Sequence, residues 1–197
     1  MNKKSHQTKW RRLDNTAKIF PVIANENLSN VFRVSVTLKG DVVPEILQQA
    51  LEEVLPWFDG FNVRLRRGFF WYYFETNKKM PIVEKEATYP CKYIDPRSNQ
   101  QFLFRVSYYE KRINLEVFHA ITDGMGAINF LKELTYHYVE LLKIKDSSKK
   151  VTRRPSSECI LDTEDSYLKN YKRLANKPYS TKKAYQLKGE VLYLDTV

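Results

Sequence analysis

The residues best suited to chemistry are the histidine, aspartate and glycine of residues 119–124, which read HAITDG. Residues 113–118, just before the histidine, alternate apolar and polar side chains as a half-buried strand does. Residues 124–142 repeat apolar side chains at helical spacing. A histidine at such a junction can expose its imidazole in a cleft while the scaffold holds it still. We therefore predict that His119 is a catalytic base.

The spacing His-x-x-x-Asp-Gly resembles the signature of the superfamily of chloramphenicol acetyltransferases and peptide-synthetase condensation domains. Three upstream segments, in the same order, resemble bacterial alcohol acetyltransferase-like members: 10–15 (WRRLDN), 17–21 (AKIFP) and 62–73 (NVRLRRGFFWYY). The resemblance covers about residues 10–143. A motif with only three fixed positions is moderately specific, so the upstream segments strengthen the assignment.

The resemblance implies transfer of an acyl group from acetyl-CoA or another acyl-CoA to a hydroxyl or amine acceptor. His119 would take the acceptor's proton, a role that suits neutral imidazole and contributes ~10²–10⁴-fold. No covalent intermediate and no bound cofactor are implied, because acyl-CoA is a co-substrate. Asp123 would form a salt bridge that fixes the motif loop, and we expect Arg64 as its partner, with Arg66 as the second choice. Gly124 would permit a tight turn and a close approach.

The resemblance also bears on domain organisation. Full-length relatives are about twice as long and place the active site between two similar lobes. We expect residues 1–144 to form the N-terminal lobe and residues 145–197 to form a basic linker, with a short helix near 162–175, leading toward an absent second lobe. Trimeric chloramphenicol acetyltransferases are short, but their histidine motif lies near the C-terminus rather than at a position like 119. Self-association or a second lobe would complete the site.

The fold expected from the pattern is α+β: a chloramphenicol-acetyltransferase-like lobe with a mixed, mostly antiparallel sheet and helices packed on one face. We expect a strand at 31–38 and a helix from about Pro44 to Pro56. Two hairpins should follow, one with strands 61–66 and 69–75 and a turn at Gly68, the other with strands 101–109 and 112–118, separated by an irregular stretch. The last expected element is the helix 124–142, whose apolar face comprises Ile128, Leu131, Leu134, Tyr138 and Leu141.

Composition excludes several classes of protein. Of the 197 residues, 43% are hydrophobic and 14% aromatic, which is ample for a packed core. Two cysteines, Cys91 and Cys159, are too few for a disulfide framework, and no second histidine or cysteine lies at ligand spacing from His119 for a metal site. A polar first twenty residues and the lack of a long apolar run predict no signal peptide, no membrane span and a cytoplasmic location.

The net charge is +10, and half of that excess falls in residues 145–197. A solvated basic tail is the favoured interpretation. Attraction of coenzyme A phosphates is another, whereas nucleic-acid binding has no supporting motif. The aromatic run 69–74 could stack bases or line a tunnel, but a core strand is the commoner explanation. His137 and His6 are interpreted as bystanders.

A non-catalytic alternative remains open. A lone lobe keeps the base but loses much of the positioning that makes a base effective. The chain could therefore be a lobe that binds a ligand or partner without turnover.

Overall fold

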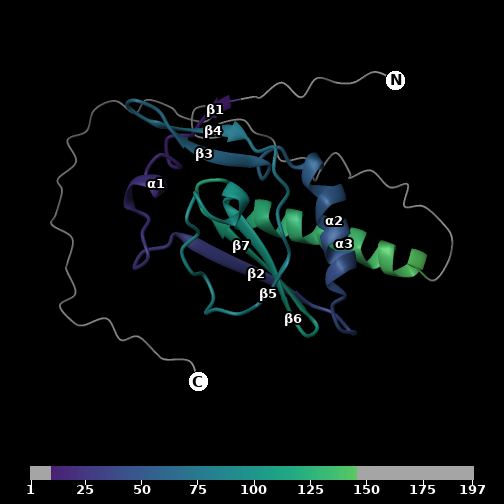
Figure 1. Ribbon diagram of the computed structural model, residues 1–197. Helices are drawn as coiled ribbons and strands as arrows, with labels where there is room; N and C mark the ends of the chain where they lie inside the picture. The colour runs from purple at the N-terminus through teal and green to yellow at the C-terminus, as the bar shows by residue number, and fades with distance from the viewer. Residues whose placement is uncertain (1–9, 146–197) are drawn as a thin grey trace, which may run out of the picture. The chain divides into compact units, whose positions relative to one another are not determined.

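The computed structural model describes residues 10–145 (Figure 1). In chain order its elements are β1 (Trp10–Arg12), α1 (Phe20–Ile23), β2 (Val31–Thr37), α2 (Pro44–Val54), the 3-10 turn η1 (Leu55–Trp57), β3 (Val63–Arg67), β4 (Tyr72–Thr76), β5 (Glu84–Lys85), the 3-10 turn η2 (Asn99–Gln101), β6 (Phe104–Tyr109), β7 (Arg112–Phe118) and α3 (Gly124–Lys145). The expected short helix near 162–175 and the expected linker beyond residue 145 lie outside the described residues.

The strands form two sheets rather than one. Sheet A has the order β1-β4-β3 and is antiparallel throughout. Sheet B has the order β2-β7-β6-β5, antiparallel except for the short parallel pair β5–β6. The α+β class with mostly antiparallel pairing is confirmed.

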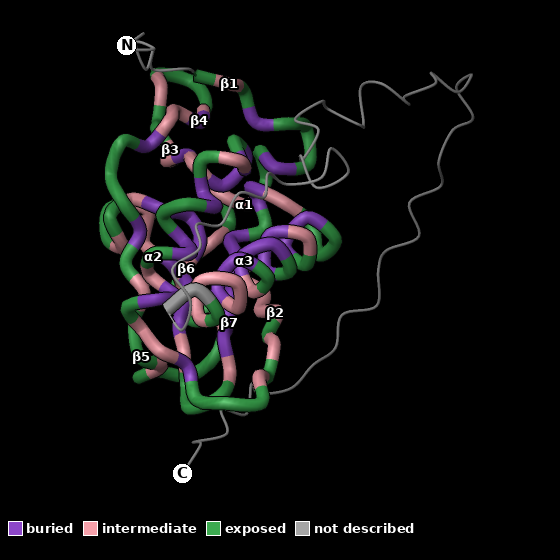
Figure 2. The backbone as a smooth tube through the Cα atoms, turned by 90° about the vertical axis from the view of Figure 1, so that its right-hand side faces the viewer, coloured by how far each residue is buried: buried purple, intermediate pink, exposed green. Residues whose placement is uncertain are grey.

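The two longer helices lie on one side of sheet B. α3 packs against β2 and β7, and α2 packs against α3 (Figure 1). Buried positions, drawn in purple, concentrate where α2, α3, β6 and β7 meet (Figure 2). The core is therefore a helix layer against the apolar face of sheet B.

Periodicity predicted the core face of α2 correctly. The helical spacing of apolar residues predicts a stripe of Ile46, Leu47, Ala50, Leu51, Val54 and Leu55. The first five are the buried side chains of α2, and Leu55 is buried in η1. The α-helix ends at Val54, and Pro56 lies in η1, where a 3-10 turn tolerates it.

The predicted face of α3 needs a correction. Leu131, Leu134 and Tyr138 are buried, but Ile128 is 49% exposed. The buried stripe begins instead with Ala127 and Phe130. Phe130 stacks on Phe61, with ring centroids 4.1 Å apart, so the helix turns its aromatic side chain rather than Ile128 toward the core.

The first hairpin also differs from its prediction. Its turn follows Gly68, as expected, but β4 starts at Tyr72. Residues 69–71 lie in the turn, where the side chains of Phe69 and Phe70 are exposed. Interpreting the run as a core strand was therefore wrong for residues 69–71. It holds for residues 72–74, which lie in β4, where Phe74 is buried and Tyr72 packs against the core.

The second hairpin forms as predicted, and its second strand leads to His119. β6 and β7 pair with Tyr109 opposite Arg112. The turn between them holds Glu110 at φ 47°, a left-handed conformation that a two-residue hairpin turn requires. β7 then runs across the centre of sheet B and ends at Phe118, immediately before His119.

Candidate functional site

His119 is exposed at the point where β7 ends and the chain turns toward α3. Its backbone N–H donates to the carbonyl oxygen of Asn30, 2.9 Å away, just ahead of β2. This bond fixes the main chain of the histidine to the neighbouring strand. The sequence prediction of a histidine held at a strand end agrees with this geometry.

Two phenylalanine rings hold the imidazole. Phe20 of α1 stacks on His119 with ring centroids 5.0 Å apart and an interplanar angle of 10°. Phe32 of β2 meets the same ring at 4.9 Å and 56°. Within residues 10–145 no side chain hydrogen-bonds to either imidazole nitrogen, so the ring is oriented by packing while both nitrogens stay open to a ligand.

Asp123 acts as the N-cap of α3. Its Oδ1 accepts a hydrogen bond from the backbone N–H of Gly126 at 2.8 Å, and its carbonyl oxygen accepts one from Ala127. A capping aspartate accepts a hydrogen bond from a free amide of the first turn, and its negative charge interacts favourably with the positive end of the helix dipole. Asp123 therefore fixes the motif loop, but through a helix cap.

The expected ion pair between Arg64 and Asp123 is absent from the described part of the chain. Arg64 binds Glu75 instead, with its Nη2 2.6 Å from the carboxylate. The reason is register, because Arg64 and Glu75 are directly opposite each other in the β3–β4 pair. Arg66, the second choice, lies 3.5 Å from the same carboxylate.

Gly124 is not forced to be glycine by its protein surroundings. Its φ is not in the left-handed region, and a Cβ built there would meet no heavy atom within 4 Å in the described structure. The predicted tight turn and close approach involve no protein atom described here. The close approach at Gly124 therefore stays a prediction.

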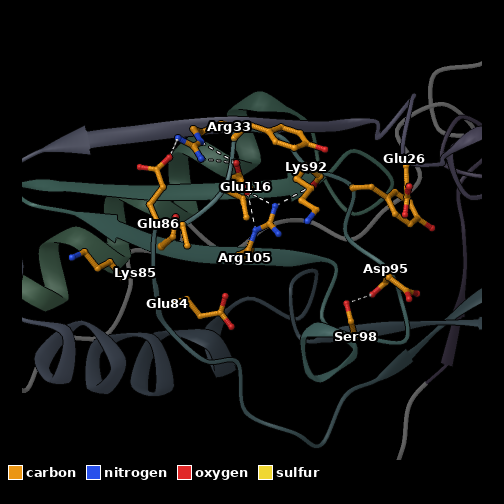
Figure 3. Close-up of a pocket in the computed structure, with 15 residues that line it drawn as sticks. Glu26, Arg33, Glu84, Lys85, Glu86, Lys92, Asp95, Ser98, Arg105 and Glu116 are labelled. Atoms are coloured by element: carbon orange, nitrogen blue, oxygen red, sulfur yellow. Dashed lines mark hydrogen bonds and ion pairs between the residues drawn. The ribbon is translucent and has the colours of Figure 1, made fainter. Parts of the chain in front are cut away.

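The face of sheet B opposite α3 carries a network of charges that the sequence prediction missed. In the strand register, Arg33 of β2 and Arg105 of β6 flank Glu116 of β7. The Glu116 side chain is only 3% exposed and accepts hydrogen bonds from both arginines and from the backbone N–H of Cys91 (Figure 3). Three cross-strand positions thus form one buried ion cluster.

Glu86 extends this network to a second row. Its carboxylate binds Arg33 and Arg112 and accepts a hydrogen bond from Asn114. Burial alone would raise the pKa of Glu86, but the hydrogen bonds and charges of Arg112 and Arg33 outweigh it, so the pKa lies below its usual value. Glu86 is therefore held as a carboxylate.

A cavity of about 530 Å³ opens over this polar face (Figure 3). Its charged and polar lining residues include Arg33, Glu84, Lys85, Glu86, Lys92, Asp95, Ser98, Arg105 and Glu116. The most buried of these charges are already paired with one another, so the network supports the strand that carries His119. The signal was present in the sequence, since charged residues interrupt three predicted strands, but only the register shows that they meet.

No group of three or more histidine, cysteine, aspartate or glutamate side chains is placed to hold a metal ion in residues 10–145. None of the helices described there is long and apolar enough to cross a membrane.

No family model matches the chain, and no curated protein matches it. Solved structures do match by shape. The starter condensation domain of the rhizomide synthetase RzmA aligns with a TM-score of 0.56 at 12% identity, over 75% of this chain and 40% of that one.

Two further structures agree with this match. Polyketide synthase associated protein 5 from Mycobacterium tuberculosis aligns with a TM-score of 0.51 at 15% identity, over 74% of this chain and 36% of its own. A mutant of the RzmA starter condensation domain in complex with C8-CoA aligns with a TM-score of 0.54 at 13% identity, over 68% and 36%. The fold is that of a condensation-domain lobe, and the chain spans well under half the length of these proteins.

Proposed function

We propose that this chain is the histidine-bearing half of an acyltransferase that moves an acyl group from acyl-CoA to a hydroxyl or amine acceptor. The observation that carries the proposal is the His119 imidazole, which is exposed at the end of β7 and oriented by Phe20 and Phe32. Neither of its nitrogens is bound by a side chain among residues 10–145. The C8-CoA complex of a protein with this fold supports acyl-CoA as donor. The cytoplasm would then be its place of action.

The chemistry follows from the arrangement. Neutral imidazole accepts the proton of the acceptor's hydroxyl or amine as the acceptor attacks the thioester carbonyl. The C–S bond then breaks and coenzyme A leaves as the thiol. Asp123 contributes indirectly, because capping α3 holds the loop that carries the histidine.

Exposed apolar side chains on either side of the motif fit this proposal. On α1, which carries Phe20, Val22 and Ile23 are exposed. In the first turns of α3, Met125 and Ile128 are exposed. Such surfaces favour contact with an apolar group, which here would be the acyl chain, a second lobe, or a second copy of the chain.

The alternative is a lobe that binds acyl-CoA or a partner without turnover. It would hold if the groups that position the substrate lie outside this chain, which covers 36–40% of the length of the solved structures quoted above. A base without the groups that position the substrate gives little acceleration.

The experiment measures free thiol released from acetyl-CoA and octanoyl-CoA in the presence of a panel of alcohols and amines. The proposal expects release that requires both the donor and one class of acceptor. Calorimetry with octanoyl-CoA separates the alternative, because binding without release identifies a non-catalytic lobe. Neither binding nor release, with a second lobe supplied on the same chain, contradicts both.

A further inference from the structure

The turn between β3 and β4 carries three consecutive aromatic side chains that the core does not use. We call Phe69, Phe70 and Trp71 the aromatic tip. They are 94%, 80% and 57% exposed. Their rings contact each other, with centroids 4.6 Å apart for Phe69 and Phe70 and 6.1 Å apart for Phe70 and Trp71. A soluble surface rarely presents so much adjacent aromatic area without a binding role.

The hairpin holds this tip in a defined shape. The Gly68 N–H donates to the Trp71 carbonyl oxygen at 2.8 Å, closing the turn so that Phe69 and Phe70 occupy its end. A Cβ at Gly68 would lie 3.0 Å from that oxygen, which is tighter than ordinary contacts. The glycine therefore permits the close turn that projects the two phenylalanines.

Arginine side chains lie at the base of the tip. Arg67 lies next to the turn, and Arg12 and Arg66 flank Tyr73 from the two neighbouring strands. Residues 60–74 contain three arginines and no acidic residue. The next carboxylate along the chain, Glu75, is shared by Arg64 and Arg66. The tip and its base therefore complement an anionic surface.

The shape of the tip favours one kind of occupant. A stable protein–protein interface buries about 800 Å² on each partner, more than a few side chains at the end of one hairpin supply. Aromatic side chains at the headgroup level of a bilayer need no complementary surface, and arginine is attracted to anionic lipids. We propose that the aromatic tip inserts into the interfacial region of a membrane containing anionic lipids.

The test uses the full chain and vesicles of phosphatidylcholine with or without phosphatidylglycerol. We expect the chain to sediment with the vesicles that contain phosphatidylglycerol. Phe69→Ser/Phe70→Ser should lower the partition coefficient by at least about tenfold, since burial of phenylalanine side chains drives insertion. The matched control Met80→Ser/Ile82→Ser, which changes two exposed apolar side chains elsewhere, should bind like the natural sequence.

Tryptophan fluorescence locates the contact. Addition of the anionic vesicles should shift the emission to shorter wavelength, and Trp71→Phe should abolish the shift. Arg12→Gln/Arg67→Gln should remove the preference for anionic vesicles. Circular dichroism should be unchanged in every variant, because these side chains are exposed.

Three outcomes overturn the proposal. Vesicle binding retained in Phe69→Ser/Phe70→Ser would assign the contact to another part of the basic chain. If the natural sequence binds no vesicles, insertion of the aromatic tip into a membrane is excluded directly. Sedimentation showing a dimer that the same double variant dissociates would make a second copy of the chain the occupant.

Discussion

Glu116 and His119 lie three residues apart at the end of one strand and are built in opposite ways. Glu116 is buried, and its two oxygens accept hydrogen bonds from Arg33, Arg105 and Cys91. Within residues 10–145, His119 is exposed and held by ring packing and its backbone. A charge with all its partners in place specifies structure, whereas an oriented ring with open nitrogens is available for proton transfer.

The largest expected effect on stability comes from removing Glu116, the structural residue of this pair. Glu116→Ala leaves Arg33 and Arg105 partly buried without their shared carboxylate. We expect it to lower the free energy of unfolding by about 3–5 kcal/mol, measured by denaturant titration. Glu84→Ala is the matched control: Glu84 lines the same cavity but is exposed, and its removal should change stability by less than about 0.5 kcal/mol. Equal effects would show that the ion cluster does not support the sheet.

A smaller effect tests the helix cap at Asp123. Asp123→Ala should cost about 1 kcal/mol, whereas Asp123→Asn should keep most of the stability because asparagine also caps helices. The effect of Arg64→Ala should add to that of Asp123→Ala within about 0.5 kcal/mol, since the two side chains have separate partners. A strong coupling between them in thermal unfolding would restore the ion pair that the sequence predicted.

The pair between Glu53 and His137 predicts a pH dependence. His137 Nε2 lies 2.6 Å from the Glu53 carboxylate and joins α3 to α2. Burial raises the pKa of Glu53, but hydrogen bonds from His137 and Gln49 outweigh it, so the pKa lies below its usual value. The carboxylate therefore stabilises the fold above the usual pKa of a glutamate, and this contribution is lost as pH falls through the lowered pKa.

Glu53→Gln should accordingly reduce stability near pH 7 by about 1 kcal/mol or less, because Glu53 is partly exposed. The difference from the natural sequence should shrink in unfolding curves recorded as pH falls through the lowered pKa of Glu53. A difference that grows on acidification would have the wrong sign for this pair.

The smallest effect is expected at Gly124. Gly124→Ala should change stability by no more than about 0.5 kcal/mol, because the position starts α3 and no described atom crowds a Cβ there. A loss above about 1.5 kcal/mol would mean that a close approach does constrain this glycine.

The local pattern was enough to predict several features of the fold. Strand alternation and helical spacing located β2, α2, β6, β7 and α3, and the β6–β7 hairpin placed His119 at a strand end as expected. Those signals are local, since they depend on which side chains share a face.

Pairing between distant residues could not be predicted in the same way. From the sequence alone, any of several carboxylates could be the partner of Arg64. Only the β3–β4 register places Glu75 opposite it. The cluster around Glu116 likewise depends on the order β2-β7-β6. The aromatic run 69–74 matched a strand by composition, but the two-residue turn after Gly68 placed its first residues in solvent.

The central claim is that His119 is the base of an acyl transfer, and the most direct measurement compares rates of acceptor-dependent thiol release. His119→Ala should lower the rate by at least ~10²-fold while thermal unfolding stays unchanged, because the imidazole is exposed. His6→Ala, the matched histidine control, should keep the natural rate. A natural rate in His119→Ala would contradict the assignment of His119 as the base.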